Sequence, residues 1–283
     1  MHRATHPAGP GPLTPAEAAE SAEPGTAHQT LRGIAARALN LALALAIFLA
    51  CWAALAAALR RNIMPYPWDV LPVFVEEIQG DLWDHTAASA ERVLKAVAFA
   101  TLIATPVGMG LGQIRVLNRI FSPLIGLVHP IPKIVFLPVI LVIMGIGETS
   151  KVFLIALILF FQILVVVRDE AASLRPELIQ SVRSLGAGRR ALFRYVYLPA
   201  SLPAVLTALR VSVGTAIAVL FMAEQYSTRQ GLGYYIVTLT WQRLRYEKMY
   251  AGILAMSLLG LAFYLAVDAL ERVVGRWRHA GEN

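Results

Sequence analysis

The centre of the chain, from Arg168 to Pro199, reads RDEAASLRPELIQSVRSLGAGRRALFRYVYLP and contains six arginines. Long apolar segments lie on both sides of it. Charged side chains are costly in the hydrocarbon of a bilayer, so six arginines within one span would not be tolerated. The stretch therefore predicts a polar loop between two membrane-spanning helices.

The loop is predicted to begin with a short helix. Pro176 suits the first helical turn, and Gly186 suits the left-handed residue that ends a helix. Three apolar residues share one face of it: Leu178, Val182 and Leu185. A second short, arginine-rich helix follows, which Pro199 and Pro203 are predicted to break before the next span. The two helices form an elbow with an apolar stripe and an arginine rim.

Two interpretations fit such an elbow: it binds either another protein or the membrane surface. An apolar centre surrounded by charged residues is typical of a protein interface. Arginines at the membrane surface also bind anionic lipid headgroups. The residues alone leave both interpretations open.

The composition of the whole chain indicates a membrane protein. Of 283 residues, 57% are hydrophobic and 15% charged, and the mean hydropathy is +0.61, whereas soluble domains have about a quarter charged residues. Three uncharged runs cover residues 39–59, 96–114 and 249–267, each long enough to cross a hydrocarbon core of about 30 Å. The net charge of +7 is attributed to arginines beside the helices rather than to nucleic-acid binding. A single cysteine, Cys51, excludes a disulfide framework within the chain.

The predicted fold is an all-α polytopic membrane protein with about six spanning helices. Their predicted ranges are 34–59, 82–113, 120–145, 151–167, 202–224 and 249–270. The third is interrupted by His129-Pro130-Ile131-Pro132-Lys133, and the fifth contains Arg210. Irregular backbone at membrane depth needs protein or water to satisfy it. Both irregular helices are therefore predicted to face the protein interior.

Four segments are predicted along the chain. Residues 1–30, rich in Ala, Pro, Gly and Glu, form a disordered tail. Residues 31–81 contain the first spanning helix and an extracytoplasmic segment, residues 82–276 form the core domain, and residues 277–283 form a second tail. Thirteen Arg and Lys residues flank the helices on the side of the elbow, against seven on the other side. This bias predicts that both termini and the elbow are cytoplasmic.

Ionisable residues at membrane depth are candidates for a substrate pathway. Lys133, Arg210 and Glu224 are proposed for this role, and Glu148 lies at the end of a predicted span. Structural ion pairs, or side chains that reach the membrane surface, are the alternative for each residue. No catalytic residue and no metal site are predicted.

The chain has no Gly-x-x-x-x-Gly-Lys-Ser/Thr sequence, so it has no phosphate-binding loop of that type. Gly108-Met109-Gly110-Leu111-Gly112 is rich in glycine but lies within a predicted span. Small residues in spanning helices allow close helix packing. Packing, rather than nucleotide binding, is predicted for this stretch.

The elbow resembles the signature of permease subunits of bacterial ATP-binding cassette importers. That signature is Glu-Ala-Ala, three residues, Gly, nine residues, Ile, any residue, Leu-Pro. Counted back from Leu198-Pro199, Val196 occupies the Ile position and Gly186 the Gly position. Gln180-Ser181-Val182 then stands at the Glu-Ala-Ala position and departs from it. The literal Glu170-Ala171-Ala172 has the wrong spacing to the glycine.

The resemblance extends from about residue 82 to residue 276. Four further stretches are similar to the nitrate, sulfonate and taurine branch of these permeases: residues 129–138, Gly145-Ile146-Gly147-Glu148, residues 231–236 and Met249-Tyr250-Ala251-Gly252-Ile253. The resemblance implies the type I importer fold, with the elbow as the coupling helix for a cytoplasmic ATP-binding subunit. It implies contact by these residues: Gln180, Ser181, Val182, Arg183, Leu185, Gly186, Ala187 and Arg189.

The resemblance also implies the partners and the solute. Two permease copies would form the pathway in the bacterial plasma membrane, and an extracytoplasmic binding protein would deliver the solute. ATP and Mg would bind the partner subunit, so this chain would have no cofactor and would not be an enzyme. The solute would be a small anion such as a sulfonate, taurine or nitrate. A vitamin precursor is the alternative within the family, and a secondary transporter or an intramembrane enzyme is the alternative outside it.

Overall fold

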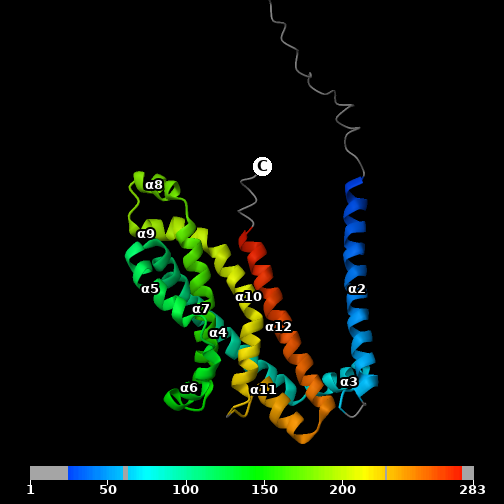
Figure 1. Ribbon diagram of the computed structural model, residues 1–283. Helices are drawn as coiled ribbons and strands as arrows, with labels where there is room; N and C mark the ends of the chain where they lie inside the picture. Colours follow the sequence, from blue (N-terminus) through cyan, green and yellow to red (C-terminus); the bar gives the residue numbers. More distant parts are fainter. Residues whose placement is uncertain (1–24, 60–62, 227, 276–283) are drawn as a thin grey trace, which may run out of the picture. The chain divides into compact units, whose positions relative to one another are not determined.

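The computed structural model describes residues 25–59, 63–226 and 228–275, and within these ranges the chain forms helices and connecting loops without a strand. The chain divides into two compact units, residues 1–60 and 61–283 (Figure 1). Five helices are long and apolar enough to cross a membrane, or six if one bent pair counts as a span. The predicted all-α membrane fold is confirmed.

The first unit contains a single described helix, α2 (Gly25–Leu59). It begins before the predicted residue 34 and reaches into the segment expected to be disordered. The reason is local, since residues 25–38 include four alanines and two arginines, which favour helix. Its part that can cross a membrane is Ala38–Leu59, where the leucines are exposed. The rest of the predicted tail, residues 1–24, lies outside the described residues, as do residues 276–283.

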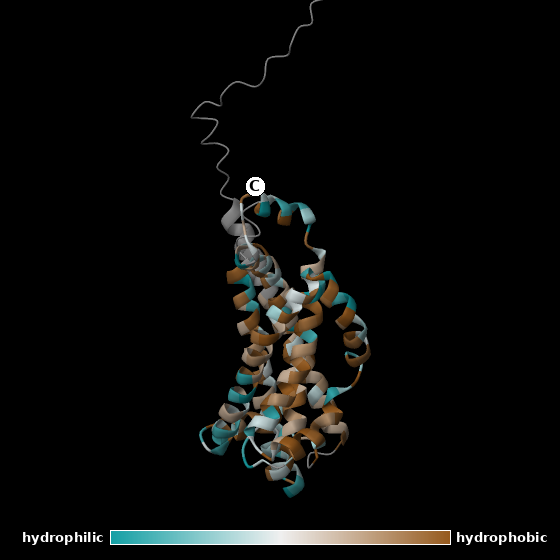
Figure 2. Cartoon of the chain, turned by 90° about the vertical axis from the view of Figure 1, so that its left-hand side faces the viewer, coloured by the Kyte–Doolittle hydropathy of each residue, from teal (hydrophilic) through white to brown (hydrophobic). Residues whose placement is uncertain are grey.

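The second unit contains the remaining elements. In chain order they are α3 (Pro67–Ile78), α4 (Asp81–Gln113), α5 (Arg115–Val128), η1 (Lys133–Phe136), α6 (Leu137–Met144), α7 (Glu148–Ser173), α8 (Pro176–Ser184), α9 (Arg189–Leu192), η2 (Phe193–Tyr197), α10 (Leu198–Glu224), α11 (Leu232–Tyr234), η3 (Tyr235–Thr240), η4 (Trp241–Arg243) and α12 (Tyr246–Gly275). Helix α8 lies at one end of this unit, and α3, α6 and α11 lie at the opposite end (Figure 1). Figure 2 shows hydrophobic residues along the middle of the long helices and hydrophilic residues towards their ends.

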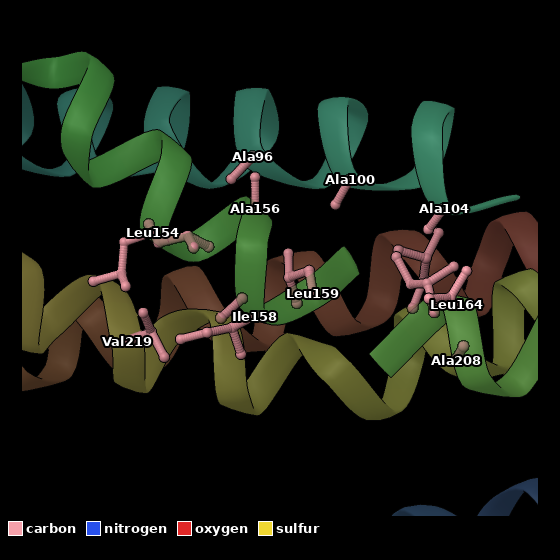
Figure 3. Packing of buried hydrophobic residues seen from close by; sticks show 14 of the residues in the cluster. Ala96, Ala100, Ala104, Leu154, Ala156, Ile158, Leu159, Leu164, Ala208 and Val219 are labelled. Carbon is pink, nitrogen blue, oxygen red and sulfur yellow. The ribbon is translucent and has the colours of Figure 1, made fainter. Parts of the chain in front are cut away.

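The core of the second unit is built around α7, which packs between α4 and α10 (Figure 3). Helix α4 presents small residues at every fourth position to α7: Ala96, Ala100, Ala104, Gly108 and Gly112. Residues four apart lie on one helix face, so this row allows the two backbones to approach closely. Leu154, Leu159 and Leu164 of α7 fill the remaining space and are buried.

The glycine-rich stretch of α4 packs against α7, as predicted. A Cβ added to Gly112 would lie 2.5 Å from the Arg168 carbonyl oxygen and 2.7 Å from the Ala171 Cβ. A Cβ on Gly108 would lie 3.0 Å from the Leu164 carbonyl oxygen, whereas one on Gly110 meets nothing within 4 Å. Gly110 therefore faces away from the contact.

This difference predicts opposite effects for two alanine substitutions. Gly112→Ala forces the backbones of α4 and α7 apart and is expected to destabilise the protein by about 1–3 kcal/mol. Gly110→Ala adds no contact and favours helix, so we expect no loss and a gain of up to about 1 kcal/mol. Thermal unfolding of the two variants in the same detergent measures the difference. A melting temperature of Gly112→Ala at or above that of Gly110→Ala would contradict this packing.

The predicted third span is a broken one. Helix α5 and the η1–α6 segment meet at an angle of 81° around residues 129–132. Lys133 stabilises the break, because its Nζ donates hydrogen bonds to the carbonyl oxygens of Val128 (3.0 Å) and His129 (2.7 Å). These carbonyls lie at the end of α5, and the Val128 oxygen also accepts a hydrogen bond from Ile131 N at 3.2 Å. A cation there also opposes the negative end of the helix dipole.

The predicted break before the fifth span is wrong, since Arg190–Glu224 forms one continuous apolar helix. Pro199 is the second residue of α10 and directly follows a π-helical turn of the same continuous helix. Residues 193–197 widen into a π-helical turn, and Leu198 N donates to the Phe193 carbonyl five residues before it. This turn adjusts the hydrogen bonds ahead of the prolines.

Candidate functional site

The first helix of the elbow, α8, consists of exposed and half-buried residues and contacts α9. Helix α8 has no buried residue. Leu185 is 84% exposed, and Leu178 on the same stripe is also exposed. Exposed leucines at both ends of one apolar stripe indicate a surface that another molecule covers.

The turn after α8 has the predicted left-handed geometry. Gly186 has φ +84°, and its N–H donates to the Arg183 carbonyl oxygen at 2.9 Å. An added Cβ would meet nothing within 4 Å, so space does not require glycine here. The backbone conformation does, because residues with a Cβ disfavour positive φ.

No side chain caps the start of α8. The Ser173 hydroxyl, which precedes it, donates to the Glu170 carbonyl oxygen at 2.8 Å, at the end of α7. Arg175, in extended conformation, precedes α8 and makes no side-chain cap. Of the predicted coupling residues, Gln180, Ser181, Arg183, Leu185 and Gly186 are exposed, and Val182 and Ala187 are half-buried. Arg189 begins α9, and its side chain lies outside the described atoms.

At the opposite end of the unit, Arg92 of α4 is 1% exposed and bridges two carboxylates. Its Nε and Nη2 donate to the two carboxylate oxygens of Glu148, at 2.6 and 2.5 Å. Its Nη1 donates to Glu224 Oε1 at 2.5 Å and to the Gln230 carbonyl oxygen at 2.9 Å. We call Arg92, Glu148, Glu224 and the adjacent Lys151 the ionic cluster. It ties the first residue of α7 and the last residue of α10 to α4.

Glu224 is the fully enclosed member of the ionic cluster. Besides Arg92, the Ser89 hydroxyl lies 2.8 and 2.9 Å from its two carboxylate oxygens, and Gly233 N donates at 2.9 Å. Ser89 Oγ also accepts a hydrogen bond from Leu232 N at 2.8 Å. A buried carboxylate requires this many partners to remain charged.

The loop before α11 approaches the ionic cluster at Gly231. Gly231 has φ +118°, and its N–H donates to His85 Nδ1 at 3.1 Å. A Cβ at this position would lie 2.5 Å from Glu224 Oε1. Both the backbone conformation and the space therefore require glycine, which explains the Gly231-Leu232-Gly233 sequence beside the carboxylate.

The three residues predicted for the substrate pathway belong to three different sets of contacts and do not form one site. Glu224 belongs to the ionic cluster, and Lys133 stabilises the end of α5 and lies 4.7 Å from the centre of the Phe161 ring. Arg210 forms ion pairs with Asp268 (3.5 Å) and Glu271 (3.1 Å) of α12. The alternative of a structural ion pair therefore accounts for every described contact of Arg210.

Sequence reasoning missed Arg92, although it lies within the predicted second span. The signal was present, because an arginine inside a spanning helix is a functional candidate by default. It was obscured by the amphipathic first turns of α4, where Glu91 and Lys95 are exposed and pair with each other at 2.5 Å. Nothing in the local sequence distinguishes the buried cation from the exposed one.

A second polar contact joins α3, η3 and α12 near the same end. Tyr235 OH donates to Glu77 Oε2 at 2.5 Å, and the Lys248 ammonium donates to the other carboxylate oxygen. Burial acts to raise the pKa of Glu77, but these two partners outweigh it and hold the pKa below its usual value. Burial, followed by the bond to Glu77, raises the pKa of Tyr235, so its hydroxyl stays protonated as a donor.

The lowered pKa of Glu77 predicts a pH dependence of stability. The contact stabilises the fold above the unfolded pKa of about 4.3, and this contribution is lost as the pH falls through the lower folded pKa. We expect Glu77→Gln to lower the melting temperature at pH 7 and to approach the wild-type protein only as the pH falls below the lowered folded pKa of Glu77. Because Lys248 is only half-buried, the effect at pH 7 is at most about 1 kcal/mol. Glu76→Gln, on the exposed side of α3, is the control, and a difference from wild type that grows on acidification would contradict the prediction.

Comparison with known proteins identifies the family. The family described as binding-protein-dependent transport system inner membrane component matches residues 101–276. The chain is 34% identical to the taurine transport system permease protein of Escherichia coli, over 69% of this chain and 71% of that protein. It is 28% identical to an E. coli permease named for aliphatic sulfonates, over 78% and 84% of the two chains. It is 30% identical to the riboflavin transport system permease protein of Chloroflexus aurantiacus, over 85% and 90%.

A solved structure confirms the fold. A chain of the methionine transporter MetNI superimposes with a TM-score of 0.58 at 22% identity, over 70% of this chain and 98% of that chain. This likeness concerns the fold alone. The family match and the curated permeases carry the assignment, and they confirm the resemblance predicted from the elbow: the chain belongs to the binding-protein-dependent transport system inner membrane components and is a membrane permease subunit of an ATP-binding cassette importer.

Proposed function

We propose that this permease imports a small sulfonate, of which taurine is the first candidate. The single observation that carries the proposal is the 34% identity to the taurine permease over about two thirds of both chains. The permease named for aliphatic sulfonates supports the same chemical class.

The proposed assembly contains two copies of this chain, with both termini and α8 in the cytoplasm. Each α8 docks on one ATP-binding subunit, which binds ATP and Mg, and a solute-binding protein docks at the other side of the membrane. Family membership supports the two kinds of partner. The bare apolar stripe of α8 and its fixed turn at Gly186 support the docking role.

The proposed mechanism is a rigid-body movement. Closure of the ATP-binding subunits displaces α8, and the movement passes into α7 and α10, which flank the elbow in the chain. Because α7 packs closely on α4 and α10, these helices move as packed units rather than bending individually. The elbow thereby converts ATP binding into a change in solute access to the pathway at the end of the unit opposite α8.

Solute uptake by the reconstituted importer tests this proposal. The permease is placed in liposomes with its ATP-binding and solute-binding partners, and uptake of radiolabelled taurine is measured with ATP and with a non-hydrolysable analogue. We expect taurine uptake with ATP and none with the non-hydrolysable analogue. Excess methanesulfonate should reduce this uptake. Uptake without ATP, or no uptake of any sulfonate by an assembly that hydrolyses ATP, would overturn the proposal.

Riboflavin is the second candidate solute, because the chain covers 90% of the riboflavin permease at 30% identity. The same liposomes distinguish the two candidates. ATP-dependent uptake of riboflavin that excess taurine does not reduce would favour a vitamin importer.

A further inference from the structure

We propose that Arg92 is an anion receptor within the permease and that the Glu148 carboxylate is its removable occupant. A sulfonate or carboxylate group of the passing solute would replace Glu148 on the guanidinium. This inference rests on the proposed function, because it assumes that the solute carries a sulfonate or carboxylate group. The ionic cluster would then bind the solute in addition to holding the helices together.

The two carboxylates of the cluster differ in how firmly they are held. Glu224 has 0% side-chain exposure and accepts hydrogen bonds from Arg92, Ser89 and Gly233. The Glu148 side chain is 61% exposed, and within the described residues Arg92 alone donates hydrogen bonds to it. Glu224 is therefore the fixed counter-ion, and Glu148 can rotate away into open space without breaking another contact.

The geometry of the bond to Glu148 fits a small oxyanion. Two nitrogens on one edge of the guanidinium meet two oxygens of one carboxylate, at 2.6 and 2.5 Å. Arginine binds carboxylates and similar oxyanions in this forked manner, and a sulfonate also offers two oxygens to one edge. The Nη1 atom stays bound to Glu224 and Gln230, so the receptor edge keeps its orientation when Glu148 leaves.

The charges of the cluster favour a monovalent anion as the replacement. Arg92 and Lys151 balance Glu148 and Glu224 while all four are in place. Lys151 is buried, and its Nζ donates to the Gly147 carbonyl oxygen at 3.1 Å. Departure of Glu148 leaves one net positive charge in a buried site, where an uncompensated charge is costly. An arriving sulfonate removes that cost, whereas a cation would increase it.

The position of the cluster links anion binding to opening. Glu148 is the first residue of α7, and its bond to Arg92 holds that end of α7 to α4. Replacement of Glu148 by a free anion removes this connection and leaves the Arg92–Glu224 connection between α4 and α10. When the anion takes the place of Glu148 on Arg92, the first residue of α7 is released from α4 in the same step. This step takes place at the end of the unit opposite α8.

The test uses the full chain in lipid nanodiscs, with methanesulfonate as the anion and choline chloride as the control at equal ionic strength. In Glu148→Gln the neutral amide cannot neutralise the positive charge of Arg92. The Nε and Nη2 edge of the guanidinium can therefore bind the added anion. We expect methanesulfonate at about 100 times its Kd to raise the melting temperature of this variant by about 5 °C or more. The wild-type protein should respond less, because Glu148 competes. Lys95→Gln, an exposed cation on the same helix, should behave like wild type.

Chemical modification provides a second test if Glu148→Gln does not reach the membrane. Glu148→Cys is prepared in a Cys51→Ala background, which leaves one thiol in the chain. A methanethiosulfonate reagent that attaches a sulfonatoethyl group should restore the melting temperature towards the wild-type value. The analogous trimethylammonium reagent should lower it further. Equal effects of the two reagents, or equal responses of Glu148→Gln and wild type to methanesulfonate, would overturn the receptor.

These results are separate from the uptake experiment. Methanesulfonate stabilisation of Glu148→Gln together with no sulfonate uptake would retain the receptor and remove the proposed solute. Sulfonate uptake together with no anion effect on Glu148→Gln would retain the solute and leave the ionic cluster a structural ion pair.

Discussion

Leu185→Glu is expected to release the ATP-binding subunit from the permease while the permease remains in the membrane. Leu185 is 84% exposed and stands beside the turn at Gly186, so no contact within the described chain depends on it. In the proposed complex the new carboxylate would be buried in the apolar centre of an interface without a partner. We expect affinity to fall by at least about tenfold, which corresponds to about 1.4 kcal/mol. Co-purification and solute-stimulated ATP hydrolysis in proteoliposomes measure it.

Two controls make this result specific to the elbow. Leu244→Glu places the same charge on an exposed leucine between η4 and α12, outside the elbow, and should leave the ATP-binding subunit attached. Gly186→Ala costs about 1 kcal/mol of backbone strain at φ +84°, whereas Gly188→Ala meets nothing within 4 Å and has no positive φ. Weakened coupling is therefore expected for Gly186→Ala and not for Gly188→Ala. Wild-type coupling in Leu185→Glu would favour the membrane-surface interpretation of residues 168–199.

Arg92→Met is expected to cause the largest loss of stability. It removes the cation between Glu148 and Glu224 and leaves Glu224, with 0% side-chain exposure, as a buried charge without its ion-pair partner. Removal of one partner of a buried ion pair costs about 3–5 kcal/mol. Thermal unfolding in detergent should show a marked decrease in melting temperature, with less protein recovered from membranes.

A double substitution separates lost charge pairing from lost packing. Adding Glu224→Gln to Arg92→Met removes the stranded charge, so the double variant should be more stable than Arg92→Met alone. Lys95→Met is the matched control, because Lys95 is exposed and forms its ion pair with the exposed Glu91, so the change should alter stability by at most about 1 kcal/mol. If Arg92→Met were as stable as Lys95→Met, the ionic cluster would not hold α4, α7 and α10 together.

The elements that could be predicted share a local cause. The last residues of α4 and α10 follow from the long apolar runs that these helices contain. Pro176 marks where α8 begins, and Gly186 marks where it ends. The effect of Pro199 was not predictable in this way, because its missing donor is accommodated by a π-helical turn that depends on the preceding residues. Helix α3 was also not predicted, since its apolar residues are too few to span a membrane. Pro67 and Val70 become buried, and Phe74 partly buried, only when the rest of the unit is present.

The sequence by itself determined that the chain crosses the membrane several times, that an arginine-rich elbow interrupts the spans, and that the elbow has the spacing of an importer permease. These properties depend on hydrophobic length, charge and the spacing of glycine and proline along the chain. Only the tertiary structure decided which charged residues meet. Arg92, Glu148 and Glu224 are far apart in sequence, and helix packing brings the Arg92 guanidinium within 2.5 Å of each carboxylate. Arg210 instead pairs with α12, because the partner of a buried charge is set by helix packing, which no local pattern records.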